Sequence, residues 1–179
     1  MNPMVSANEI HDISPLTAAL IGGMGLLVMA VVAALSNFGA INSLTASGDA
    51  GATARNLVNS AALFRLGAVG LIVTAILDIV VAWAIYVVLR TVNPSLSLLG
   101  AWLRLAYAAI FAAAIGSLFS ALRAAPVDPA QTLFLLKTYD QGWHIGLVIF
   151  GLHLGVVGFL VWRPGFFSRS LRCDCLVAG

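Results

Sequence analysis

Residues 73–86, "VTAILDIVVAWAIY", decide the fold of this chain. They place one acid, Asp78, in an otherwise apolar stretch of a longer span that extends from about Leu63 to Leu89. That run exceeds the roughly 20 residues that a helix needs to cross the ~30 Å hydrocarbon layer of a bilayer. Because a backbone in lipid must satisfy its own hydrogen bonds, we expect a transmembrane helix rather than a strand.

Three further apolar runs have a similar length and cover about residues 15–35, 98–122 and 143–162. We therefore predict an all-α, polytopic helical transmembrane bundle with four spans over residues 15–163. A polar segment, 1–14, precedes it, and residues 164–179 form either a simple tail or the start of a further span that is cut short. Two short interfacial helices are expected between the spans, in residues 49–66 and 130–140.

The composition excludes several classes of protein. Of the 179 residues, 61% are hydrophobic and 9% are charged, whereas soluble domains carry about 25% charged residues. The net charge of +2 and the lack of a Lys/Arg run argue against a nucleic-acid partner. The partners we expect are the lipid bilayer and either further copies of the chain or another membrane protein.

Basic residues near the span ends bear on orientation. The side that carries both termini has four arginines, and the opposite side has three or four basic residues: Arg90, Arg163, Arg169 and Arg172 against Arg55, Arg123, Lys137 and, at the edge, Arg65. This small excess predicts both termini on the cytoplasmic side. The first span lacks the basic start of a secretory signal, so we expect it to remain in the protein.

The helical wheel of the second span separates two faces. Small and polar residues gather on the side of Asp78, and bulky residues lie on the other: Gly67, Leu71, Thr74, Ala75, Ala82 and Ile85 against Val69, Ile72, Val73, Ile76, Val80, Trp83 and Val87. Small faces favour close helix packing in lipid. Asp78 is therefore expected to point into the bundle, near the middle of the bilayer.

A charge at that depth needs a partner, water or a proton. Arg104 lies one to two turns into the third span, and the loop before that span is short, so antiparallel packing would bring the two side chains together. Two interpretations remain open. Asp78 is either a structural contact that fixes helix register, which we favour, or a proton or cation site that involves Arg104, His153 and Thr74.

The fourth span carries two histidines. His144 is four residues after Asp140 and can contact it, as the start of a capped helix or as a pH-responsive pair. His153 lies on the opposite face of the same helix, so the two rings cannot share a metal from this helix alone. We expect His153 to be hydrogen-bonded in the core, to Tyr107 or Thr74. Glycines on both faces predict neighbours on both sides, from missing helices or a dimer.

Catalytic and metal motifs are missing from the sequence, so we expect no enzyme activity, cofactor or metal. Cys173 and Cys175 supply only half of a zinc site. The function we predict is that of a non-enzymatic integral membrane protein of unassigned role with a buried polar contact around Asp78. The alternative is a small proton-linked or cation-linked transporter that uses Asp78, Arg104 and His153.

Three segments resemble the "domain of unknown function 4386" proteins, a bacterial membrane family: "GDAGATARNLVNSAALFRLG", "ILDIVVAWAIYVVLRTVN" and "YDQGWHIGLVIFGLHLGVVGFLVWRPGFF". The resemblance covers roughly residues 18–167, and Arg65, Asp78, Asp140 and His153 fall on matching motif positions. It implies a six-helix, multi-pass protein of the cell membrane, here the bacterial inner membrane, with no assigned activity. Because family members continue into two more apolar helices, we expect this chain to be truncated or frame-altered at "RPGFFSRSLRCDCLVAG".

Overall fold

The computed structural model describes residues 13–163, and the described part is built from helices and their connections, without strands. The helices are α1 (Pro15–Ala34), η1 (Leu35–Asn42), α2 (Ala50–Asn59), α3 (Ala61–Leu89), α4 (Pro94–Ala124) and α5 (Pro129–Trp162). The structure therefore confirms the all-α class.

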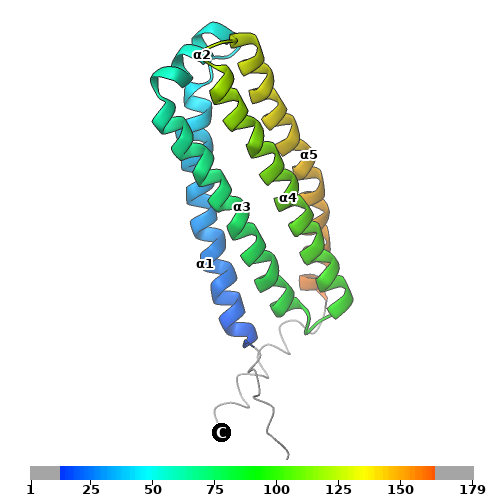
Figure 1. The fold of residues 1–179 in the computed structure, drawn as a ribbon. Coiled ribbons are helices and arrows are strands. Elements are labelled where there is room, and N and C mark those ends of the chain that lie inside the picture. The colour runs from blue at the N-terminus through cyan, green and yellow to red at the C-terminus, as the bar shows by residue number, and fades with distance from the viewer. Residues whose placement is uncertain (1–12, 164–179) are drawn as a thin grey trace, which may run out of the picture.

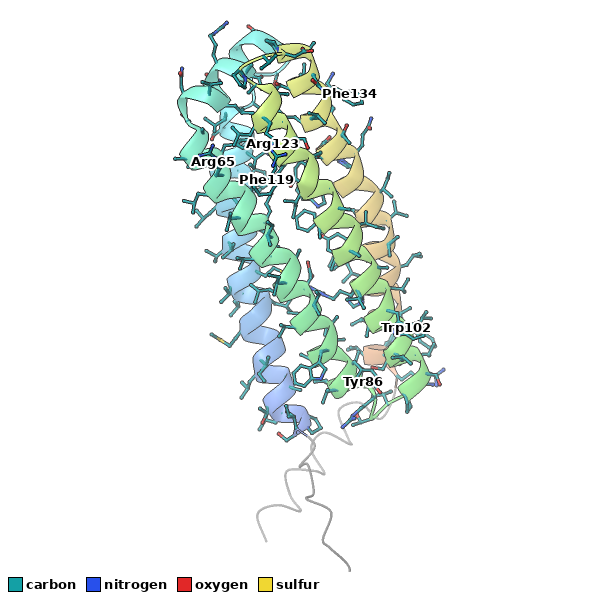
Figure 2. All side chains as sticks on the ribbon, viewed as in Figure 1. Arg65, Tyr86, Trp102, Phe119, Arg123 and Phe134 are labelled. Carbon is teal, nitrogen blue, oxygen red and sulfur yellow. The ribbon has the colours of Figure 1, made fainter. Side chains whose placement is uncertain are left out.

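Within residues 13–163, four helices are long and apolar enough to cross a membrane, which is the architecture of a multi-pass membrane protein. The first is α1 continued by η1, with 28 residues, and α3, α4 and α5 have 29, 31 and 34 residues. Each predicted span lies within one of these helices. Tyr86 and Trp102 lie near one end of the bundle, and Arg123 and Phe134 lie near the other (Figure 2). Such residues are typical of membrane interfaces.

The long helices pack in chain order. The main contacts join α1 to α3, α3 to α4, and α4 to α5, with each helix antiparallel to its neighbour in this order (Figure 1). The α3–α4 turn lies at the same end of the bundle as the start of α1 and the end of α5. At the opposite end, α2 packs across the bundle against α5 and α3. α3 and α4 are the most buried of the four.

Side-chain caps fix where these helices begin. Each cap oxygen accepts a hydrogen bond from a backbone N–H in the first turn, at 2.8–3.1 Å: Ser14 for α1, Asp49 for α2, Asn93 for α4 and Asp128 for α5. Proline follows three of these caps, where its missing N–H costs nothing.

The first helix is longer than the sequence predicts. The predicted span ends near Leu35, but the chain stays helical to Asn42 through the π-helix η1. Two glycines of α3 make room for η1. A Cβ on Gly67 would lie 2.6 Å from the Ala40 Cβ, and one on Gly70 would collide with the Ser36 hydroxyl. π-helices are rare and occur frequently at functional sites.

The prediction of two short interfacial helices is half right. α2 is a separate short helix, and α3 begins beyond a break at Ser60, whose backbone leaves the helical region (φ −119°, ψ 35°). Residues 130–140, however, belong to α5, which runs unbroken from Pro129 to Trp162. No proline interrupts this stretch, and Gly142 packs against Ala114 of α4 instead of ending the helix.

The two faces of α3 are nearly those that the helical wheel predicts. Asp78 and its small neighbours are buried, and most bulky residues of the other face are exposed. Val87, predicted to face outward, is buried. The reason is that α3 buries a second face against α1, where Gly22 and Gly25 admit Ala84 and Val81 at close range.

Only one face of α5 is covered within the described part of the chain. Gly142 and Gly146 contact α4, whereas a Cβ on Gly151, Gly155 or Gly158 would meet nothing within 4 Å. The prediction of neighbours on both faces therefore remains a prediction for the second face.

Candidate functional site

The structure brings Asp78 of α3 and Arg104 of α4 together in the middle of the bundle. Arg104 Nη2 lies 2.7 Å from Asp78 Oδ1, and each side chain is 2% exposed. The two helices are antiparallel and joined by a short turn, so both residues lie at a similar height. Opposite charges in contact are far less costly in lipid than either charge alone.

The charges are paired, but the hydrogen bonding is incomplete. Despite the short contact, Asp78 Oδ1 accepts no well-aligned hydrogen bond from the described residues, and Arg104 Nε donates none to them. Both atoms are buried. Buried polar atoms without partners are uncommon and cost free energy, so this centre is balanced in charge yet not saturated.

His153 of α5 supports the arginine. Its Nε2 lies 3.4 Å from Arg104 Nη1, and its Nδ1 lies 2.8 Å from the Gly100 carbonyl oxygen of α4. A guanidinium only donates and a carbonyl only accepts, so the ring is the neutral tautomer that donates from Nδ1 and accepts at Nε2. His153 therefore links the Arg104 side chain to the Gly100 carbonyl of α4, the helix that carries Arg104.

The predicted partners of His153, Tyr107 and Thr74, are wrong as hydrogen-bond partners. The packing of α5 on α4 sets the ring opposite the Gly100 carbonyl. Thr74 is buried, but its hydroxyl donates to the Gly70 carbonyl of its own helix at 3.0 Å. This hydrogen bond is to the backbone of α3 and not to the charged residues, so the place of Thr74 in the polar site stays a prediction.

Two residues of this site were missed in the sequence. Met29 of α1 places its sulfur 4.0 Å from Arg104 Nη2, and the Phe150 ring of α5 lies 5.3 Å from Arg104 Cζ. The latter geometry is that of a cation–π contact. Phe150 is three residues before His153 and could have been found from that spacing. Met29 has no local signal, because only tertiary packing brings α1 to the arginine. All four long helices thus contribute to the Asp78–Arg104–His153 centre.

Asp140 and His144 are neighbours on α5, but they do not begin a helix. His144 Nδ1 lies 2.7 Å from the Asp140 carbonyl oxygen and 3.5 Å from its carboxylate, and the side chains are 61% and 66% exposed for Asp140 and His144. The prediction of a capped helix start is wrong because α5 begins a dozen residues earlier, behind Asp128. A pH-responsive role for the pair stays a prediction.

The remaining candidates lie apart from the centre. Arg65 is exposed near the α2 end of the bundle (Figure 2). Within residues 13–163, no three His, Cys, Asp or Glu side chains are grouped as a metal site would require. Cys173 and Cys175 lie outside the described residues, so the expectation that they form only half of a zinc site stays a prediction.

Comparison with known proteins agrees with the resemblance. The model of the family described as "Domain of unknown function (DUF4386)" matches residues 21–179. An "Uncharacterized protein" of Archaeoglobus fulgidus is 32% identical over 110 residues, which are 62% of this chain and 59% of the relative. The match therefore spans less than two thirds of that relative's length. No solved structure matches the chain.

Proposed function

Because this chain belongs to the domain of unknown function 4386 family, whose description assigns no activity, we propose a function from the buried centre itself. The protein is a non-enzymatic, multi-pass protein of the cell membrane, with a structural or accessory role. In it, Asp78, Arg104 and His153 hold the spans in one register.

The observation that carries this proposal is the closure of the centre. Asp78 and Arg104 are each 2% exposed and His153 is 1% exposed. Neither of the two cavities described for the molecule is lined by any of these three residues. A carrier site must open to water or substrate on at least one side, whereas a structural contact gains from exclusion of water.

A paired measurement tests the proposal. The thermal stability of wild type and Asp78→Asn is compared in detergent, and proton flux is followed in proteoliposomes with a pH-sensitive dye. We expect a large loss of stability in the variant and no wild-type flux above that of empty liposomes. Wild-type flux that Asp78→Asn abolishes, at unchanged stability, would contradict the proposal.

The second candidate is a small proton-linked or cation-linked transporter at the same centre. Asp78 Oδ1 favours it: the atom is paired with the Arg104 charge but accepts no well-aligned hydrogen bond from the described residues, and so keeps a lone pair for a proton or cation. The double variant Asp78→Asn/Arg104→Gln separates the two candidates. If the pair is structural, the protein loses little stability when both charges are removed together. If the centre is a carrier site, the double variant loses its flux completely.

Two further assignments belong to the same proposal. The lipid bilayer is the immediate partner, and we expect association with further copies or with another membrane protein. The membrane is the cell membrane, specifically the bacterial inner membrane. Fractionation of expressing cells, followed by native mass spectrometry from lipid nanodiscs, tests the location and the association together.

A further inference from the structure

A cavity of about 260 Å³ lies between η1 with its following loop and the first half of α5. It is at the α2 end of the bundle, away from the Asp78–Arg104–His153 centre (Figure 1). Asn37 and Tyr139 line it together with Lys137, Asp140 and Trp143. The volume is below the range typical of drug-sized ligands, so the cavity suits a smaller molecule.

Two residues that line this cavity each carry a buried polar atom without a hydrogen-bond partner among the described residues. Asn37 and Tyr139 are each 4% exposed, and neither the Asn37 Oδ1 nor the Tyr139 hydroxyl has a hydrogen-bond partner among the described residues. Such atoms are rare in folded proteins, because each costs free energy. Here the two atoms belong to residues that line one cavity, and Asn37 lies on the π-helix. This arrangement is typical of a binding site for a polar ligand.

The lining residues define the chemistry of that ligand. The Asn37 oxygen only accepts, so it calls for an N–H or O–H donor, and the Tyr139 hydroxyl can donate to an oxygen. Exposed Lys137 and Asp140 add one charge of each sign, and Trp143 adds an aromatic surface that suits an ammonium group. A ligand with both an ammonium and an oxyanion matches all of these groups.

We propose that this cavity binds a small zwitterion. Its primary ammonium donates to Asn37 Oδ1, and its oxyanion accepts from the Tyr139 hydroxyl near Lys137. Two sources carry this chemistry: a free amino acid, and the phosphoethanolamine head group of a lipid. Another cavity, around Arg55 and Pro126, carries no such inference, because none of the residues with an unpartnered buried atom lines it.

The test uses the full chain in phosphatidylcholine nanodiscs. Binding of radiolabelled O-phosphoethanolamine and of radiolabelled L-alanine is measured at equilibrium, and a third preparation contains phosphatidylethanolamine in the disc. We expect saturable binding of at least one soluble probe, or a thermal stabilisation specific to phosphatidylethanolamine. Alanine binding identifies the free amino acid as the source, and the lipid effect or phosphoethanolamine binding identifies the head group.

Two variants connect the binding to the cavity. Asn37→Leu removes the acceptor at similar volume and should weaken binding about tenfold, the loss of one hydrogen bond to a charged group. Because it also removes an unpartnered buried polar atom, its melting temperature should not fall, which a purely structural Asn37 would not permit. Tyr139→Phe should weaken binding without unfolding the protein.

The matched control is Tyr86→Phe, since Tyr86 lies at the opposite end of the bundle (Figure 2) and outside the cavity. It should leave binding unchanged. Absence of saturable binding and of any lipid-specific stabilisation at millimolar probe would overturn the proposal. So would binding that persists unchanged in both Asn37→Leu and Tyr139→Phe.

Discussion

At the scale of single residues, the free energy of this protein is most sensitive at Asp78. Its carboxylate lies 2.7 Å from the Arg104 guanidinium, with both side chains withdrawn from solvent. Removing one member of such a pair leaves the other charge buried alone. That typically costs ~3–5 kcal/mol, much more than the loss of an exposed pair.

We therefore predict that Asp78→Asn lowers the free energy of unfolding by roughly 3–5 kcal/mol. Reversible unfolding in mixed detergent micelles measures it. Asp140→Asn is the matched control, because that acid is 61% exposed and should change stability by about 1 kcal/mol or less. Equal stability of both variants would show that the buried acid is not held as an ion pair.

The apolar double variant Asp78→Leu/Arg104→Met should recover most of the stability that Asp78→Asn loses. Well-packed apolar residues often replace a buried ion pair at no cost or with a gain. The same micelle unfolding experiment gives the comparison. A double variant as unstable as the single one would mean that the ion pair stabilises the fold more than well-packed apolar side chains do.

His153→Phe should destabilise the protein by about 1–3 kcal/mol, because Arg104 Nη1 then loses its buried acceptor. His144→Phe is the control, since that ring is 66% exposed on the other face of α5. Urea or detergent titration of the two variants side by side measures the difference. A larger loss in His144→Phe would contradict the assignment of His153 as the buried acceptor for Arg104.

Residue patterns could predict half of the centre. The helical wheel of α3 was sufficient to turn Asp78 inward, and the short loop was sufficient to place Arg104 beside it. The partners of His153 could not be predicted, because a backbone carbonyl such as that of Gly100 has no side-chain signature and depends on the register of α5 on α4. The contact of Met29 depends in the same way on how α1 approaches.

At the scale of helices, close packing depends on where glycine lies. A Cβ on Gly67 would approach the Ala40 Cβ to 2.6 Å and the Ser36 carbonyl oxygen to 3.2 Å, both on η1. We predict that Gly67→Ala destabilises the protein by about 1–3 kcal/mol through overpacking. Gly151→Ala meets nothing within 4 Å and should be neutral or slightly stabilising in the described fold. Thermal unfolding of both alanine variants decides this, and a severe loss in Gly151→Ala would reveal a neighbour on that face.

Helix existence could be predicted from hydrophobicity, but helix ends could not. Apolar runs locate the membrane-crossing parts, and caps such as Asn93 and Asp128 explain where helices start. The π-helix η1 was missed because a change of hydrogen-bond register has no composition of its own. The sequence did not predict that α5 is one continuous helix, because its first half carries Lys137 and Asp140. This polarity resembles that of a separate interfacial segment.

At the scale of the whole molecule, the topology makes the orientation testable. In a chain whose native cysteines are replaced by serine, Val127→Cys on the α4–α5 turn and Ser95→Cys near the α3–α4 turn lie at opposite ends and are both exposed. With both termini cytoplasmic, an impermeant maleimide should label Val127→Cys in intact cells and Ser95→Cys only after permeabilisation. The reverse pattern would invert the assignment and place the cavity on the cytoplasmic side.

The number of spans and the lengths of the loops were sufficient to predict how the long helices are arranged. Consecutive spans must alternate in direction, and the short loop before the third span predicts an antiparallel pair with the second, which the structure has. The cavity near α2 could not be predicted, since Asn37 and Tyr139 are more than a hundred residues apart and neither belongs to a recognisable motif. Sites of this kind form where a loop packs against a helix that is distant in the sequence, and local sequence patterns do not predict such tertiary contacts.

The four-residue connection between α3 and α4 also bears on how the protein is made. A nascent span that carries a lone aspartate or a lone arginine passes inefficiently from the insertion machinery into the lipid bilayer. Asp78 and Arg104 are consecutive in synthesis and separated by one tight turn, so the second charge emerges while the first is still near the exit. The pair can then leave as a neutral hairpin. Lengthening the turn should therefore lower the yield of membrane-inserted protein before it changes the stability of molecules that have already folded.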